Sequence, residues 1–119
     1  MDAITRFEEL KCWQAARILT VYDISKQGLL AKDFDLRSQI RRASVSSMSN
    51  IAEGFGRFSN REFIRYLEMS QGSAPEVRSI SYVIQDQQYL DMDKIEIIRA
   101  EAEKAKSLAL GLIRYLKRD

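Results

Sequence analysis

Residues 35–55 read DLRSQIRRASVSSMSNIAEGF, and this stretch decides the fold. Its core positions recur every three or four residues, which places them on one face of an α-helix. That face consists of Leu36, Ile40, Ala43, Ser47 and Ile51. Six alanine and serine residues between positions 43 and 52 have side chains small enough to let a second helix approach closely. The stretch therefore predicts a central, tightly packed helix from about Asp35 to Phe55.

Capping signals mark where this helix begins, where it ends and where the next one begins. Asp33 or Asp35 suits the first position, because a carboxylate there accepts a hydrogen bond from a free backbone amide. The run Gly54-Phe55-Gly56 is a turn signal. Ser59 and Glu62 then have the spacing of a capping box, in which each side chain bonds the backbone of the other residue.

The next helix is predicted from Asn60 to about Gln88. Pro75 lies inside it and lacks an amide donor, so the sequence predicts either a kink or a fresh helix capped by Ser73. Asp93 is the predicted cap of the last helix. The core positions of that helix follow a spacing of three and four residues, as in a heptad pattern. These positions are Ile95, Ile98, Ala102, Ala105, Ala109, Leu112 and Leu116.

The first helix is predicted from about Phe7 to Lys26, with Gly28 as a stop signal. Its apolar residues cover more than one stripe, and a helix that is apolar on most sides is contacted on most sides. A four-helix monomer leaves an outer face in water, so this pattern predicts an oligomer. The short loops predict antiparallel neighbours. Residues 1–119 thus predict a single all-α domain, an antiparallel up-down four-helix bundle.

The composition excludes the common catalytic arrangements. The chain has no histidine and one cysteine, Cys12, so it has no Ser-His or Cys-His pair and no histidine ligand for a metal. The pairs Asp33/Asp35 and Asp91/Asp93 could be acidic metal sites, but each lies at a predicted helix start, where aspartate is a preferred cap. We therefore expect no enzyme, no metal and no cofactor. The sequence shows no signal peptide and no membrane-length apolar run, which predicts a cytoplasmic protein.

Positive charge is concentrated in the middle of the chain. Between positions 37 and 65 there are six arginines, two glutamates and no lysine, a local net charge of +4 against +2 for the whole chain. The six are Arg37, Arg41, Arg42, Arg57, Arg61 and Arg65. They could form solvated faces and ion pairs with glutamates. Alternatively they form a phosphate-binding surface, because a guanidinium offers a planar fork of donors.

Asn50 and Glu53 put polar groups on a helix that is otherwise predicted to lie in the interior. One interpretation is a buried polar network that fixes the register of the helices. The other is a role in binding. Glu53 also precedes Arg57 by four residues, which favours an ion pair along the helix.

Three runs carry a resemblance to a known family. They are SQIRRASV at 38–45, SNIAEGFGR at 49–57 and EFIRYL at 62–67. They resemble the bacterial four-helix bundle family, also called the 23S rRNA intervening-sequence protein family, because some members are encoded within insertions in large-subunit ribosomal RNA genes. The run FEELKCWQ at 7–14 is similar to the start of that family's first helix. The resemblance marks Asn50, Glu53, Gly54 and Gly56 as structural residues of the family motif.

The resemblance implies an antiparallel bundle that assembles into a homopentameric ring. Related proteins include the accessory variability protein of diversity-generating retroelements, which binds nucleic acid and a reverse transcriptase. From this and the six arginines we expect a non-enzymatic accessory protein that binds structured RNA or an RNA–DNA intermediate with weak sequence selectivity. Its expected partners are copies of itself, RNA or DNA and a nucleic-acid enzyme, but no membrane. The alternative is a protein-binding oligomeric scaffold without nucleic-acid contact.

Overall fold

The structure, a computed structural model, describes residues 4–18 and 25–118, and the elements found there are helical. The four α-helices are α1 (Lys11–Ile18), α3 (Phe34–Phe55), α4 (Asn60–Asp86) and α5 (Met92–Lys117). Two 3-10 turns, η1 (Phe7–Glu9) and η2 (Gly28–Lys32), precede α1 and α3. The prediction of an all-α bundle of four helices is confirmed.

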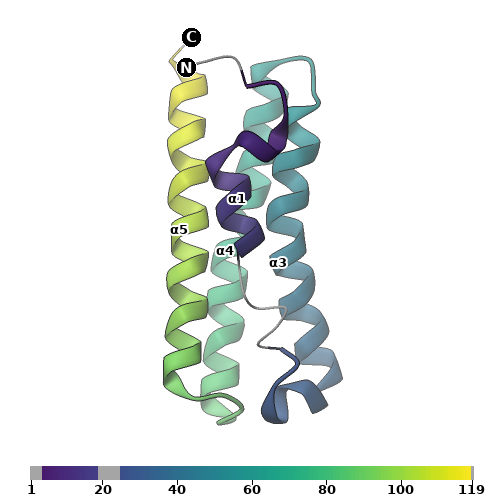
Figure 1. The fold of residues 1–119 in the computed structure, drawn as a ribbon, viewed down its shortest axis with the longest axis vertical. Coiled ribbons are helices and arrows are strands. Elements are labelled where there is room, and N and C mark those ends of the chain that lie inside the picture. Colours follow the sequence, from purple (N-terminus) through teal and green to yellow (C-terminus); the bar gives the residue numbers. More distant parts are fainter. Residues whose placement is uncertain (1–3, 19–24, 119) are drawn as a thin grey trace.

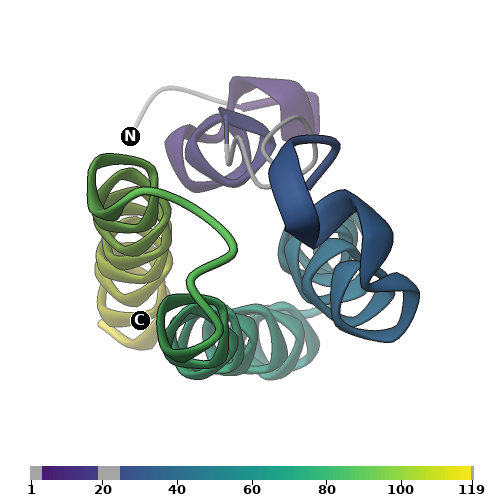
Figure 2. The same ribbon diagram turned by 90° about the horizontal axis from the view of Figure 1, so that it is seen from below.

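The helices lie side by side along the long axis of a body measuring 47 × 21 × 19 Å (Figure 1). Seen end-on, they surround a common axis in the order α1, α3, α4, α5, and each contacts the next (Figure 2). α3 and α5 run in one direction and α4 runs in the other (Figure 1). The α3–α4 turn and the end of α5 therefore lie at the same end of the bundle, opposite the α4–α5 turn.

Close contact between α3 and α4 depends on small residues. The Ser70 hydroxyl donates a hydrogen bond of 2.7 Å to the backbone oxygen of Ser47, and both residues are buried. Nearer the turn, a Cβ added to Gly54 would lie 2.5 Å from Cβ of Tyr66. No real side chain tolerates that distance, so the two helices approach at this level only because position 54 has no side chain. The predicted tight packing of residues 35–55 is confirmed.

The core consists of two stacked clusters. One fills the half near the α4–α5 turn and includes Leu30 of η2 together with Ile40 and Ile84. The other fills the half near the α3–α4 turn and is covered by α1, whose Trp13 packs edge-on against Phe7 with ring centroids 5.2 Å apart. All five predicted core positions of residues 35–55 are buried.

The first helix is shorter than predicted. It begins at Lys11, because Phe7–Glu9 form a 3-10 turn and Leu10 has extended backbone. Positions 19–24 lie outside the described residues, but Ser25 and Lys26 already form a turn, so the helix does not reach Lys26. Gly28 has a φ of +56° and opens η2 rather than ending a helix. Part of the apolar sequence that was predicted to surround the first helix therefore lies in a turn, and Phe7 of this turn packs against the core.

Caps decide the starts of the longer helices. The Asp33 side chain accepts a hydrogen bond from the amide of Leu36 and so caps α3, as one of the two alternatives predicted. Its other oxygen accepts from the Tyr89 hydroxyl at 3.0 Å, and this bond raises the pKa of Tyr89. Ser59 caps α4 through the amide of Glu62. The predicted cap Asp93 is wrong, since α5 already begins at Met92.

Two further predictions are corrected in α4 and α5. The helix assignment of α4 continues through Pro75, so the alternative of a fresh helix capped by Ser73 is wrong; Ser73 is buried inside α4. In α5 the predicted spacing holds through Ala109, but the next fully buried residue is Ile113, whereas Leu112 is half-buried. A straight helix drifts by about 20° per heptad relative to a strict seven-residue repeat, which explains the shift.

We predict that Gly54→Ala destabilises the protein by roughly 1–3 kcal/mol, because the added methyl group forces α3 and α4 apart. Urea unfolding followed by circular dichroism at fixed protein concentration measures the change. Gly111→Ala is the matched control: it also lies inside a helix, but an added Cβ has no atom within 4 Å. This control should stabilise the protein by about 0.5–1 kcal/mol. Equal effects of the two changes would contradict the role of Gly54.

Candidate nucleic-acid interface

The six arginines do not form one surface. Arg37, Arg41 and Arg42 lie in the first half of α3, whereas Arg57, Arg61 and Arg65 lie at the α3–α4 turn. The part of α3 between Arg42 and Phe55 is roughly 20 Å long at 1.5 Å per residue. The fold therefore does not bring all six arginines into a single phosphate-binding patch.

Two arginines of the first group hold neighbouring segments against α3. Arg37 Nη1 donates to the backbone oxygen of Ala31 at 2.8 Å, and its guanidinium lies 5.4 Å from the ring of Phe34. Arg41 Nε donates to the hydroxyl of Ser25 at 2.6 Å. These contacts join η2 and the chain before it to the helix. Arg42 is exposed, and within residues 4–18 and 25–118 it has no hydrogen-bond or ion-pair partner.

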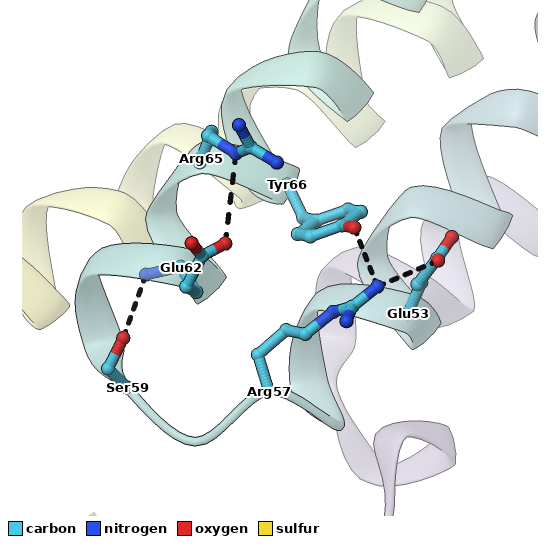
Figure 3. A network of polar contacts seen from close by, with 6 residues as sticks. All are labelled: Glu53, Arg57, Ser59, Glu62, Arg65 and Tyr66. Atoms are coloured by element: carbon cyan, nitrogen blue, oxygen red, sulfur yellow. Dashed lines mark hydrogen bonds and ion pairs between the residues drawn. The ribbon is translucent and has the colours of Figure 1, made fainter.

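Two arginines of the second group, Arg57 and Arg65, lie against Tyr66 (Figure 3). Arg57 Nη2 donates to Glu53 Oε1 at 2.9 Å and to the Tyr66 hydroxyl at 2.7 Å, and its guanidinium lies 4.8 Å from the centroid of the Tyr66 ring. Arg65 pairs with Glu62 at 3.7 Å and lies 5.7 Å from the same ring. The predicted ion pair of Glu53 with Arg57 is confirmed. Exposed pairs of this kind contribute little to stability, so the network mainly orients the side chains.

The prediction that Asn50 and Glu53 form a buried network is wrong. The Glu53 side chain is 57% exposed, and Asn50 is half-buried and donates to the backbone oxygen and hydroxyl of Ser46. The reason is helical spacing, because Asn50 and Glu53 are each turned by about 100° from the buried positions Ile51 and Gly54. Of the other motif residues, Gly54 allows the close helix contact and Gly56 ends α3.

Arg61 is the exposed arginine of this group that forms no ion pair with a described residue. It has no hydrogen-bond or ion-pair partner in the described part of the chain. With Arg65 and Lys117 it lines a groove between the first turns of α4 and the last turn of α5, and Glu62 and Glu68 also line that groove. The groove places cations from two distant parts of the sequence side by side.

Sequence reasoning missed the second half of α5. Residues 104–118 carry five cations and no acid: Lys104, Lys106, Arg114, Lys117 and Arg118. Residues 74–103, which run to and from the opposite end of the bundle, carry seven acids and three cations. Counting charges along the whole chain reveals this basic stretch, whereas counting only the arginine-rich residues 37–65 does not. We call the surface made by Arg61, Arg65, Arg114, Lys117 and Arg118 the basic end of the bundle.

Next to the basic end, a hollow of about 320 Å³ opens over the end of the core. Phe55 and Phe63 line it and pack edge-on against each other with centroids 5.9 Å apart. Tyr115 of α5 and Phe58 of the α3–α4 turn also line it. Phe58 is fully exposed, which is unusual for a phenylalanine and places an aromatic ring beside the cations.

Comparisons with known proteins agree with this architecture. The model of the 23S rRNA-intervening sequence protein family matches residues 8–111. The chain belongs to this family. A crystal structure of a protein of unknown function from the S23 ribosomal protein family of Bacteroides thetaiotaomicron is similar, with a TM-score of 0.74 and 21% identity over 86% of this chain and 97% of that one. At this identity the likeness shows the fold alone. No curated protein matches the chain.

For this member of the family, the described residues contain no group of three or more histidine, cysteine, aspartate or glutamate side chains close enough to hold a metal ion. Among the same residues, no helix is long and apolar enough to cross a membrane. Cys12 lies on the buried face of α1, and burial raises the pKa of its thiol from 9.0 to about 11. Its environment is that of a small core residue rather than a reactive nucleophile.

We predict that Cys12 reacts with a thiol reagent at pH 8 at least about 100-fold more slowly in the folded protein than in urea, because a raised pKa of two units lowers the thiolate fraction by that factor. The rate in the folded protein should keep rising with pH up to about 11, whereas the unfolded chain levels off near 9. Absorbance-monitored labelling measures both. Rapid stoichiometric labelling of the folded protein at pH 8 would contradict the buried position.

Proposed function

We propose that the protein is a non-enzymatic accessory factor that binds structured RNA or an RNA–DNA intermediate through the basic end of its bundle. The observation that carries the proposal is the groove in which Arg61 and Arg65 lie beside Lys117. Three cations from two helices converge there with two acids, Glu62 and Glu68, next to the acid-free half of α5. Converging cations at an exposed surface attract a polyanion and retain it.

Helix electrostatics alone do not account for these charges. Cations in the last turn of a helix are favoured by its dipole, and this explains Arg114 and Lys117. The dipole effect fades beyond the last turn, so it does not explain Lys104 and Lys106 or the arginines at the other side of the groove. A binding surface at the basic end accounts for the arginines of the groove, whereas Lys104 and Lys106 lie outside it, roughly 17–20 Å along α5 from Lys117 at 1.5 Å per residue.

The proposed contacts go to the phosphate backbone. Arginine and lysine side chains that face phosphates give affinity without reading bases. Sequence selectivity should therefore be weak and salt dependence strong. Of the six arginines of the middle of the chain, Arg61 and Arg65 belong to this surface, Arg57 lies at its edge, and Arg37 and Arg41 act as tethers inside the chain.

We also propose that the protein works as a homopentameric ring, as its family resemblance implies. Exposed apolar side chains on α4 support self-association: Met69, Tyr82 and Val83 are each more than two-fifths exposed. A contact with another subunit along α4 would remove these side chains from water. A ring would repeat the basic end once per subunit, so one nucleic acid could contact several copies.

A protein-binding scaffold is the second candidate. The same exposed residues of α4, together with Ile97 on α5, are the observation that favours it. In that case the bound protein, such as a nucleic-acid enzyme, would carry out the chemistry. The two candidates differ in whether the purified protein binds nucleic acid alone.

We predict that the protein binds mixed-sequence RNA and DNA single strands in low salt, and that four phosphate contacts give a log-log salt slope of roughly −3. Arg61→Ala should weaken binding to all sequences alike and make the slope shallower, by about 0.7 for each phosphate that the variant no longer neutralises. Fluorescence anisotropy at several salt concentrations measures both the affinity and the slope.

Arg42→Ala is the matched control for Arg61→Ala. Arg42 is also exposed to solvent and likewise has no partner among the described residues, but it lies in the first half of α3, roughly 20 Å from the α3–α4 turn at 1.5 Å per residue. It should leave affinity and slope unchanged. If Arg42→Ala weakens binding as much as Arg61→Ala, the basic end is not the contact surface. If the wild type does not bind at micromolar concentration in low salt, the scaffold interpretation replaces this one.

We predict that light scattering at micromolar concentration gives five times the chain mass of 13.8 kDa. Val83→Glu should reduce that mass, because it puts a charge into an interface that excludes water. A wild-type particle with the mass of one chain would contradict the ring. A stable assembly that Val83→Glu leaves intact would place the interface elsewhere than on this face of α4.

A further inference from the structure

Phe58 is the most exposed large apolar residue in the described part of the chain, at 108% of its reference accessibility. It lies in the α3–α4 turn, directly after Arg57 and three residues before Arg61. Within the described residues it has no ring or cation contact. Phe34 is different: it is also exposed, but the Arg37 guanidinium lies over its ring. Exposing an aromatic ring to water is unfavourable, so binding a group that covers the ring would gain free energy.

The surroundings of Phe58 indicate what kind of group would cover it. The hollow that it lines also contains the rings of Phe55, Phe63 and Tyr115, aliphatic side chains such as Leu112 and Leu116, and the polar side chains of Ser59 and Asn60. Rings on several sides and polar groups at the rim suit a flat, partly polar ring system. Arg61 and Lys117 line the adjacent groove and add positive charge.

We propose that this hollow receives an unpaired base of a single-stranded nucleic acid, with Phe58 as the stacking platform and with Arg61 and Lys117 near the flanking phosphates. This rests on the proposed function and makes it specific for one class of nucleic acid. An aromatic side chain next to cations is the combination by which proteins bind single strands without reading sequence, because every base has a flat face.

A single strand fits these features better than a duplex or a protein does. In a duplex the bases are already stacked on each other and cannot reach a ring at the tip of a turn. A protein partner bound through Phe58 would gain no advantage from the basic rim unless it were acidic. The strand explains the exposed ring and the cations together, and it predicts a preference for loops, bulges and single strands over paired regions.

The test compares a mixed-sequence single strand with its duplex by fluorescence anisotropy. Phe58→Leu keeps an apolar side chain but removes the aromatic face, and it should weaken binding to the single strand by roughly 5- to 100-fold. Binding to the duplex and the salt slope should stay unchanged, because phenylalanine carries no charge. Phe58→Trp should retain single-strand affinity. Phe34→Leu, a change of the exposed phenylalanine at the far end of α3, should have no effect.

The outcomes separate this inference from the proposed function. If Phe58→Leu binds the single strand as the wild type does while Arg61→Ala is impaired, the stacking site is overturned and the phosphate surface stands. If no variant and no wild-type sample binds nucleic acid, both are overturned. If Phe58→Leu lowers the mass seen by light scattering, Phe58 is a contact between copies of the chain, and the stacking site is also overturned.

Discussion

The close approach of α3 and α4 is the constraint on which the rest of the structure depends. Ser47 and Ser70 let the helices come near enough for the Ser70 hydroxyl to donate a hydrogen bond to the Ser47 backbone oxygen, and Gly54 leaves the space that Cβ of Tyr66 occupies. Because Tyr66 is fixed there, its ring and hydroxyl hold Arg57 at the start of the α3–α4 turn. A larger residue at position 54 would move Tyr66, the turn and the cations that follow it. The packing of small residues in the core thus sets the geometry of the exposed surface.

The antiparallel order of the helices gives the bundle two chemically different ends. The turn between α3 and α4 meets the acid-free half of α5 at one end, and most acids of α4 and α5 lie toward the other. Overall charge hides this asymmetry, because the whole chain carries only +2. A polyanion responds to the local field rather than to the total, since charges beyond about 10 Å are screened at moderate salt. The proposed binding surface exists because the α3–α4 turn and the end of α5 lie at the same end of the bundle.

Periodicity and capping residues are local properties, and they allowed the fold to be predicted. The buried face of α3, the Ser59 cap and the four-helix class were all recognisable in the sequence. Three details were not recognised, although two of them, the exposure of Glu53 and the burial of Ile113, follow from helical spacing. Leu10 breaks the first helix, Glu53 turns to solvent, and Ile113 replaces Leu112 in the core. The candidate site was only half predicted: Arg57, Arg61 and Arg65 come together, but their neighbours on α5 lie far away in the sequence, between positions 114 and 118.

Photochemical cross-linking would show directly whether the basic end contacts nucleic acid. A single strand containing 4-thiouridine would be bound to the wild-type protein in low salt and irradiated, and mass spectrometry would locate the attached peptides. We expect cross-links in peptides from residues 55–65 and 112–118, with Phe58 and Tyr115 as modified residues. Cross-links confined to the opposite end, around Tyr82 and Tyr89, would contradict a contact at the basic end, and so would the absence of any cross-link at saturating protein.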